Sequence, residues 1–146
     1  MEELLGSQFR SKSGDAGIES IKSAELVCIY FSASWSPPCR KFTPILRDFF
    51  TEVNSLSPKL EIVFVSSDAA GGKTEEDFSR YYEEMPWLSI PFSETQRLQK
   101  LRQEFHVQQI PCLIVLDQNA KTITKDGRQD VMREGEKAFA DWGGSP

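Results

Sequence analysis

The sequence predicts an α/β fold in which a parallel or mixed sheet is covered by helices on both faces. Three apolar runs, at 26–31, 60–66 and 112–116, have the composition of strands that are buried on both faces of a sheet. The segments between them carry apolar residues at three- and four-residue steps, which is the pattern of amphipathic helices. Strands that alternate with helices in this way favour a layered α/β domain.

The first half of the chain is predicted element by element. Gly14 and Gly17 favour a short strand pair or turn, and a brief helix follows over 18–24. The strand over 26–31 leads into a helix from about Pro37 to about Asn54, whose apolar stripe is regular. After the strand over 60–66, Thr74 and Asp77 have the spacing of a capping box, which predicts a helix from Thr74 to about Glu84.

The second half continues the alternation. A helical stripe at Leu98, Leu101 and Phe105 precedes the strand over 112–116, and a turn at 118–120 leads to a further strand over 122–124. A single last helix is predicted to contain Val131, Phe139 and Trp142. No internal repeat, linker or low-complexity tract interrupts the chain, so 1–146 is expected to be one domain, long enough to bury most of its apolar surface.

The net charge and the cysteine content indicate which partners and which compartment to expect. The net charge of −5 argues against nucleic acid or an anionic membrane as the main partner. No stretch approaches the roughly 20 apolar residues that span a bilayer, and the acidic start lacks the apolar core of a secretory signal. The three cysteines lie in or beside apolar runs and do not form an extracellular disulfide framework. A reducing compartment, the cytosol or the nucleus, is therefore expected.

The candidate site lies at the joint between the strand over 26–31 and the helix that follows. Ser36 is predicted to be the N-cap of this helix, with its hydroxyl accepting a hydrogen bond from an early backbone N–H. Pro37 takes the first helical position, where a missing N–H costs nothing. Cys39 then falls in the first turn, where free N–H groups and the helix dipole favour a thiolate.

The segment Trp35-Ser36-Pro37-Pro38-Cys39-Arg40, followed by Phe42-Thr43-Pro44, resembles the active site of thioredoxin-fold oxidoreductases of the nucleoredoxin and tryparedoxin branch. The segments 65–68 and 85–92 resemble that branch as well. The resemblance covers about residues 4–142 and implies a thioredoxin fold, with a central mixed β-sheet flanked by helices on both faces. The motif of this branch is usually Trp-Cys-Pro-Pro-Cys-Arg, so Ser36 stands where the attacking cysteine is expected.

The resemblance implies thiol–disulfide exchange, in which the first cysteine attacks and the second resolves the mixed disulfide. With Ser36 in first place this cycle is not available, because a serine hydroxyl without a base is not a nucleophile. Two interpretations of Cys39 remain: a single reactive thiol that leaves resolution to glutathione or another thiol, or a buried and inert remnant. Ser36 itself is then an N-cap, or a substitution introduced to disable or trap the site.

Ile110-Pro111 resembles the cis-proline element of the same fold. The resemblance implies that this pair bounds a substrate groove beside the motif, and that the backbone of Ile110 pairs with an extended partner segment. Trp35 is expected to be an exposed platform beside the groove, with core packing as the alternative. Pro37 belongs to the same predicted binding surface.

Other residues that could carry chemistry are assigned structural roles. Cys28 is expected to pack in the central strand, and Cys112 to be a small buried residue facing the core, with a disulfide to Cys39 as the alternative. Tyr30 occupies the place where many thioredoxins have a buried acid, and His106 is expected to be structural. Three scattered cysteines and one histidine do not have the spacing of a zinc site. No glycine-rich phosphate loop is present, so neither a metal nor a cofactor is expected.

Two functional hypotheses follow. The leading one is a thiol–disulfide oxidoreductase of the nucleoredoxin and tryparedoxin type, acting on protein thiols and disulfides through a weakened or single-cysteine site. The alternative is a redox-silent binding module that holds a protein partner in the same groove. Rapid alkylation of Cys39 favours the first hypothesis, and labelling as slow as that of Cys28 favours the second.

Overall fold

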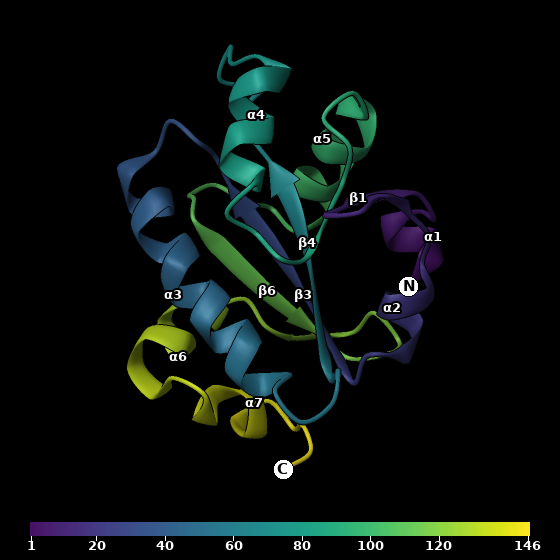
Figure 1. Cartoon of the computed structure of the whole chain (residues 1–146), viewed down its shortest axis with the longest axis vertical. Coiled ribbons are helices and arrows are strands. Elements are labelled where there is room, and N and C mark those ends of the chain that lie inside the picture. Colours follow the sequence, from purple (N-terminus) through teal and green to yellow (C-terminus); the bar gives the residue numbers. More distant parts are fainter.

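A seven-stranded mixed sheet forms the centre of the computed structural model, which describes residues 1–146 (Figure 1). Its strand order is β2-β1-β5-β4-β3-β6-β7. The central pair, β3 and β4, is parallel, and β6 adds to β3 in the antiparallel direction. The strands are β1 (Phe9–Ser11), β2 (Gly14–Ala16), β3 (Leu26–Ser32), β4 (Leu60–Ser66), β5 (Leu88–Ser89), β6 (Cys112–Leu116) and β7 (Thr122–Thr124). The predicted mixed α/β sheet is confirmed.

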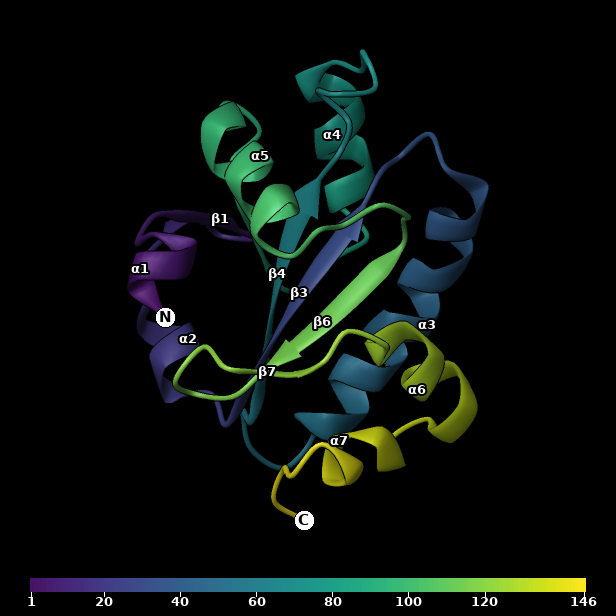
Figure 2. The same cartoon turned by 180° about the vertical axis from the view of Figure 1, so that it is seen from behind.

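Helices cover both faces of this sheet, as Figures 1 and 2 show from opposite sides. They are α1 (Glu2–Leu5), α2 (Glu19–Ser23), α3 (Pro37–Val53), α4 (Glu75–Tyr82), α5 (Thr95–Glu104), α6 (Gly127–Glu134) and α7 (Lys137–Asp141). The helices α3, α4, α6 and α7 pack on one face, and α1, α2 and α5 pack on the other. This is the layered arrangement that the alternation of elements predicts.

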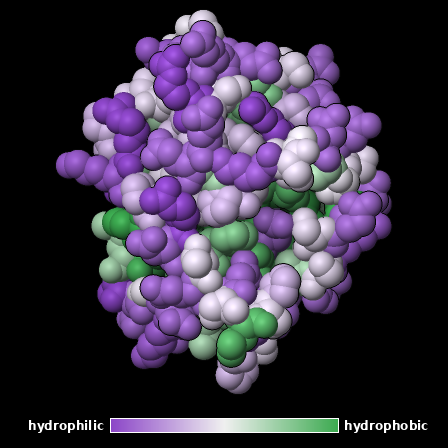
Figure 3. All heavy atoms as spheres, in the orientation of Figure 1, coloured by the Kyte–Doolittle hydropathy of each residue, from purple (hydrophilic) through white to green (hydrophobic).

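The central strands are buried on both faces, which explains why their sequences are continuously apolar. Every residue of β3 and β4 is buried. Successive side chains alternate between the two faces, so Cys28 and Tyr30 point into the core under α3, while Val27 and Ile29 point into the core under α5. The face shown in Figure 3 is mainly hydrophilic, with small hydrophobic areas. None of the helices combines the length and apolar character that crossing a membrane requires.

Most element boundaries agree with the sequence predictions. α3 begins at Pro37 and continues through Pro44, and α4 begins with a complete capping box between Thr74 and Asp77. The short strand pair near the N-terminus is present as β1 and β2. The brief helix α1 before it was not predicted, because four residues carry too little periodicity to be recognised.

The prediction of a single last helix is wrong. The segment forms two helices, α6 and α7, separated at Gly135. Gly135 has φ 58°, in the left-handed region that glycine enters without steric cost, and its N–H caps α6 by donating to the carbonyl of Val131. The chain therefore changes direction at Gly135, while Val131, Phe139 and Trp142 still reach the same core.

Candidate functional site

The sheet brings the two halves of the candidate site to one end. The motif follows the carboxyl end of β3 and opens α3. Because β6 runs antiparallel to β3 and pairs Cys112 with Phe31, the residues just before β6 lie at that same end. The Ile110–Pro111 peptide bond is cis, as the resemblance implies. Pairing of β3 with β6 thus places the motif and the cis-proline beside each other, although they are far apart in the sequence.

The motif residues differ sharply in exposure. Trp35 is 45% exposed and Pro37 and Pro38 are exposed, whereas Ser36 is 5% exposed and Cys39 is 0% exposed. Trp35 is exposed, as expected. All three cysteines are free thiols, so no disulfide joins Cys39 to Cys112. The side chains of Trp35, Pro37 and Pro38 are therefore exposed at the motif, and the sulfur of Cys39 is buried behind them.

Ser36 is the N-cap of α3, but the predicted capping hydrogen bond is absent. The residue has the extended backbone of an N-cap, with φ −97° and ψ 115°, and its carbonyl accepts from the N–H of Arg40 at 3.1 Å. Its hydroxyl makes no cap bond. An N-cap side chain bonds the N–H of the second or third helical residue, and Pro38, the second residue here, has no N–H. The two prolines fix the start of the helix but remove one of its capping partners.

A cluster of buried hydroxyl groups supports the first turn of α3 from below. We call Tyr30, Ser32, Thr43 and Tyr81 the hydroxyl cluster. The Thr43 hydroxyl lies 2.8 Å from the Tyr30 hydroxyl and 2.6 Å from the Tyr81 hydroxyl, and it donates to the carbonyl of Cys39 at 3.0 Å. Tyr81 also bonds the Ser32 hydroxyl at 2.7 Å. The cluster fixes the backbone of Cys39 against β3 and α4.

Both tyrosines of the hydroxyl cluster are neutral hydrogen-bonding groups. Burial raises the pKa of Tyr30 and the pKa of Tyr81 above the usual range for a phenol. Tyr30 occupies the place where many thioredoxins carry a buried acid, so this position holds a group that stays protonated at physiological pH. It can position the backbone of Cys39 but cannot accept a proton as a carboxylate would.

Asp68 holds the motif loop from the other side and was not identified as a site residue from the sequence. Its Oδ1 accepts the backbone N–H of Ser34 at 2.7 Å, and the residue is 0% exposed. Its second oxygen, Oδ2, is buried and has no hydrogen-bond partner. Burial raises the pKa of the Asp68 carboxyl, because the charged form loses its hydration. The signal in the sequence is a carboxylate directly after a buried strand, at the end of the sheet where the motif lies.

Relative to the unsubstituted protein, the Asp68→Asn variant is expected to gain stability as the pH rises from acidic to neutral. Since the folded-state pKa is raised, the stabilising contribution of Asp68 is complete below the unfolded pKa, about 3.9, and is lost as the pH rises through the folded pKa. Asparagine keeps the acceptor for Ser34 and does not titrate. Thermal unfolding between about pH 3.5 and pH 7.5 should show the melting temperature of the variant rising relative to the unsubstituted protein, by about 2–4 °C for each kcal/mol.

The matched control for this prediction is Asp48→Asn, on the exposed surface of α3. Its melting temperature should follow that of the unsubstituted protein throughout the pH range. Glu61, whose pKa is also raised by burial, is present in all three proteins and cancels in the comparison. A difference between Asp68→Asn and the unsubstituted protein that does not change with pH would contradict the assignment.

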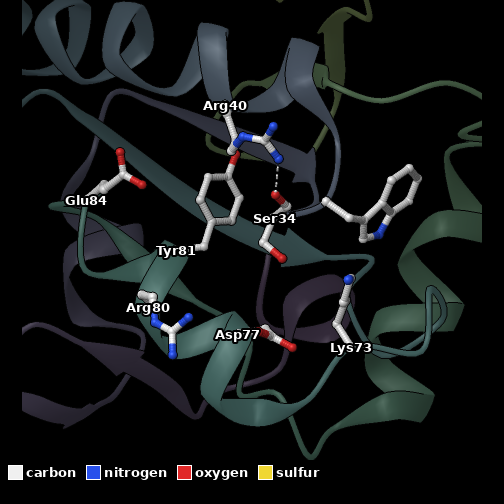
Figure 4. A pocket seen from close by; sticks show the side chains of 8 residues that line it. Ser34, Arg40, Lys73, Asp77, Arg80, Tyr81 and Glu84 are labelled. Carbon is white, nitrogen blue, oxygen red and sulfur yellow. Dashed lines mark hydrogen bonds between the residues drawn. The ribbon is translucent and has the colours of Figure 1, made fainter.

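A polar pocket opens directly beside the motif. It has a volume of about 440 Å³ and lies between the start of α3 and α4 (Figure 4). It is lined by Ser34, Trp35, Arg40, Lys73, Asp77, Arg80, Tyr81 and Glu84. The indole of Trp35 lies against the loop before α4, where a Cβ on Gly71 would come within 2.5 Å of its Nε1. The absence of a side chain at Gly71 thus leaves room for the indole that lines this pocket.

Cys112 and His106 depart from their expected surroundings in different ways. Cys112 is half-buried at the start of β6 rather than fully enclosed in the core, and partial burial raises its thiol pKa. The prediction that it faces the core is therefore only partly correct. Cys28 is fully buried in β3, as predicted. His106 is exposed, with φ 52°, in the turn after α5.

Comparisons with known proteins agree with this geometry. Residues 24–122 match the family model described as thioredoxin-like. Nucleoredoxin from Bos taurus is 36% identical over 133 residues, which cover 91% of this chain and 29% of that protein. Tryparedoxin from Trypanosoma brucei brucei is 37% identical over 133 residues, which cover 90% of this chain and 88% of that protein. The chain thus spans less than a third of the length of the nucleoredoxins and nearly all of a tryparedoxin.

Solved structures match along most of the chain as well. The structure of native tryparedoxin I from Crithidia fasciculata superimposes with a TM-score of 0.82, at 34% identity and with 92% of each chain covered. A structure of tryparedoxin II in complex with glutathionylspermidine superimposes with a TM-score of 0.78, at 32% identity, covering 90% of this chain and 88% of that chain. The thioredoxin fold that the resemblance implies is confirmed.

Proposed function

Because this chain belongs to the thioredoxin-like family, as a relative of nucleoredoxins and tryparedoxins, we propose that it binds an extended segment of a protein partner in the groove between the motif and the cis-proline, without a dithiol cycle of its own. The observation that carries this proposal is the burial of Cys39, which is 0% exposed, beneath a motif whose first position is serine. The partners we expect are proteins that carry thiols or disulfides.

Burial of the sulfur argues against rapid exchange. A thiolate displaces sulfur from a disulfide only if it can approach that disulfide directly. In a complete dithiol motif the buried second cysteine needs no access to bulk solvent, because the first cysteine holds the partner next to it in a mixed disulfide. Here Ser36 cannot form that first covalent bond. A partner in the groove therefore remains bound by non-covalent contacts.

The groove offers free backbone groups for such contacts. Neither the N–H nor the carbonyl of Ile110 makes a hydrogen bond within the chain, and its side chain is half-buried beside the buried Pro111. Unpaired backbone groups in an extended segment can add a strand from another chain. The exposed residues Trp35, Pro37 and Pro38 supply apolar contact area at the same end of the sheet.

A second candidate function is a single-cysteine reductase. It is favoured by the place of Cys39 in the first turn of α3, close to the helix N-terminus. In this reaction the Cys39 thiolate attacks a partner disulfide, forming a mixed disulfide and releasing one partner thiolate. The thiolate of glutathione then attacks the partner sulfur, which restores the Cys39 thiolate and leaves the partner joined to glutathione. A reducing compartment, the cytosol or the nucleus, would supply that thiol.

Thiol labelling of the folded protein distinguishes the two candidates. As a binding module, the protein should show alkylation of Cys39 as slow as that of Cys28, because both are 0% exposed, while the half-buried Cys112 reacts faster. Rates are measured near neutral pH by mass spectrometry of the separate peptides. If Cys39 were labelled faster than Cys112 and formed a mixed disulfide with oxidised glutathione, the reductase would be the better description.

Binding itself is tested with proteins retained by the immobilised chain and quantified against matched variants. Cys39→Ser should retain the same proteins at the same level, whereas Ile110→Trp, which fills the groove, should lose them. Ile123→Trp on β7 is the control, since Ile123 is 39% exposed and lies away from the groove. Equal retention by Ile110→Trp and Ile123→Trp would rule out the groove as the binding site.

A further inference from the structure

We propose that the polar pocket beside Trp35 binds the carboxylate of an acidic residue in the partner segment, so that this protein selects acidic peptides. The inference rests on the proposed function and assigns a specificity to it. It is carried by the charges that line the pocket, by their arrangement, and by the continuity of the pocket with the motif through Trp35.

The pocket holds positive groups that the chain itself leaves unpaired. Lys73 makes no ion pair and no side-chain hydrogen bond, and Arg40 donates only to the backbone carbonyl of Ser34, at 2.8 Å. Of the two carboxylates in the lining, Asp77 accepts the N–H and the hydroxyl of Thr74 and remains a negatively charged neighbour of Lys73. The lining carries three cations and two carboxylates, so the pocket has an excess of positive charge in a chain whose net charge is −5.

The groups that line the pocket are unevenly arranged. Figure 4 shows Arg40 reaching from α3 and Lys73 from the opposite side toward Ser34, while Glu84 lies at the far end of the pocket beyond Tyr81. Arg80 is held at the surface by an ion pair with Glu76, at 2.9 Å. Arg40 and Lys73 are therefore the cations nearest the motif, and the Asp77 carboxylate lies between Lys73 and Arg80. A guanidinium and an ammonium that face one opening are suited to a carboxylate.

The other walls indicate a peptide side chain rather than a free inorganic anion. The pocket, at about 440 Å³, is much larger than a single oxyanion requires, and the indole of Trp35 forms one of its walls. An apolar wall next to two cations fits a residue that has an aliphatic stem and an anionic end. Trp35 also belongs to the motif, so a residue adjacent to the segment in the groove can reach this pocket without a break in the peptide.

S-methylglutathione is a suitable probe, since it is an acidic peptide with two carboxylates and no free thiol. In a titration followed by ¹⁵N-correlated spectra, the signals of Ser34, Lys73 and the Trp35 indole should shift. Lys73→Gln should weaken the affinity by about threefold to tenfold, as expected for one charge-assisted contact. Lys100→Gln, the same change on the exposed face of α5, should leave the affinity unchanged. Raising NaCl to about 0.5 M should weaken binding, because exposed charges are screened.

Three outcomes would overturn the inference. The first is the absence of shifts at Ser34 and Lys73 on titration. The second is equal affinity in Lys73→Gln and Lys100→Gln. The third is tighter binding of inorganic phosphate than of S-methylglutathione at equal ionic strength, which would make the pocket a general anion site. If the probe shifts Cys112 and Ile110 but not Lys73, the groove still binds peptides while the acidic specificity fails, so the two proposals are separable.

Discussion

Ser36→Cys is expected to convert this chain into a disulfide reductase, with turnover of a generic disulfide substrate raised on the order of 100-fold or more. A 100-fold difference in rate corresponds to about 2.7 kcal/mol in the activation free energy. The substitution places a sulfur at the N-cap of α3, three residues before Cys39 and on the same side of the helix. Its thiolate would attack the substrate disulfide. Cys39 would then attack the resulting mixed disulfide and release the reduced product.

Two variants make this experiment specific. Ser36→Cys combined with Cys39→Ser, incubated with the substrate without added dithiol, should form the mixed disulfide and stop there, since the chain has no second thiol in the motif to resolve it. Ser34→Cys introduces a thiol into the same loop, but outside the first turn of the helix, and it should give no turnover. Reduction is followed with a chromogenic disulfide and an excess of dithiol. If folded Ser36→Cys is no more active than Ser34→Cys, the scaffold itself no longer supports exchange.

Local signals in the sequence were enough to predict the main elements. The stripe of α3 and the capping box of α4 depend on neighbours within a few residues, so they could be recognised in advance. The capping bond of Ser36 was predicted from the usual preference, but Pro38 has no N–H and the hydroxyl does not bond the remaining donor, the N–H of Cys39. Gly135 was overlooked as a helix end because the apolar spacing of Val131, Phe139 and Trp142 continues across it.

The candidate site depends on contacts that no local pattern encodes. Its motif and cis-proline were predicted through the resemblance, and the pairing of β3 with β6 explains why they meet. Asp68 and Tyr81 were not predicted as site residues, because each reaches the motif only through the packing of β4 and α4 around it. The position of Asp68 after a buried strand is a weak signal in the sequence, and the Tyr81 hydroxyl has none. Only the fold shows which groups these two side chains bond.

Thr43→Val is expected to be the most destabilising of the conservative substitutions near the site, by about 2–3 kcal/mol. The variant keeps the shape of the side chain but removes the hydroxyl that bonds Tyr30, Tyr81 and the carbonyl of Cys39. Tyr81 retains Ser32 at 2.7 Å, whereas Tyr30 keeps only a contact of 3.4 Å to the Cys39 carbonyl. Buried groups left without a full partner account for the cost, since water cannot replace the lost bonds.

Thermal and urea unfolding of three variants test this expectation. Thr43→Val should lower the melting temperature by about 5–10 °C, and Thr43→Ser, which restores the hydroxyl, should recover most of that loss. Thr51→Val makes the same chemical change on the exposed side of α3 and should shift the melting temperature by no more than about 1 °C. Because Thr43 bonds the carbonyl of Cys39, alkylation of Cys39 should also accelerate in Thr43→Val and not in Thr51→Val. Equal stability of the two valine variants would mean that the hydroxyl cluster does not hold the first turn of α3 in place.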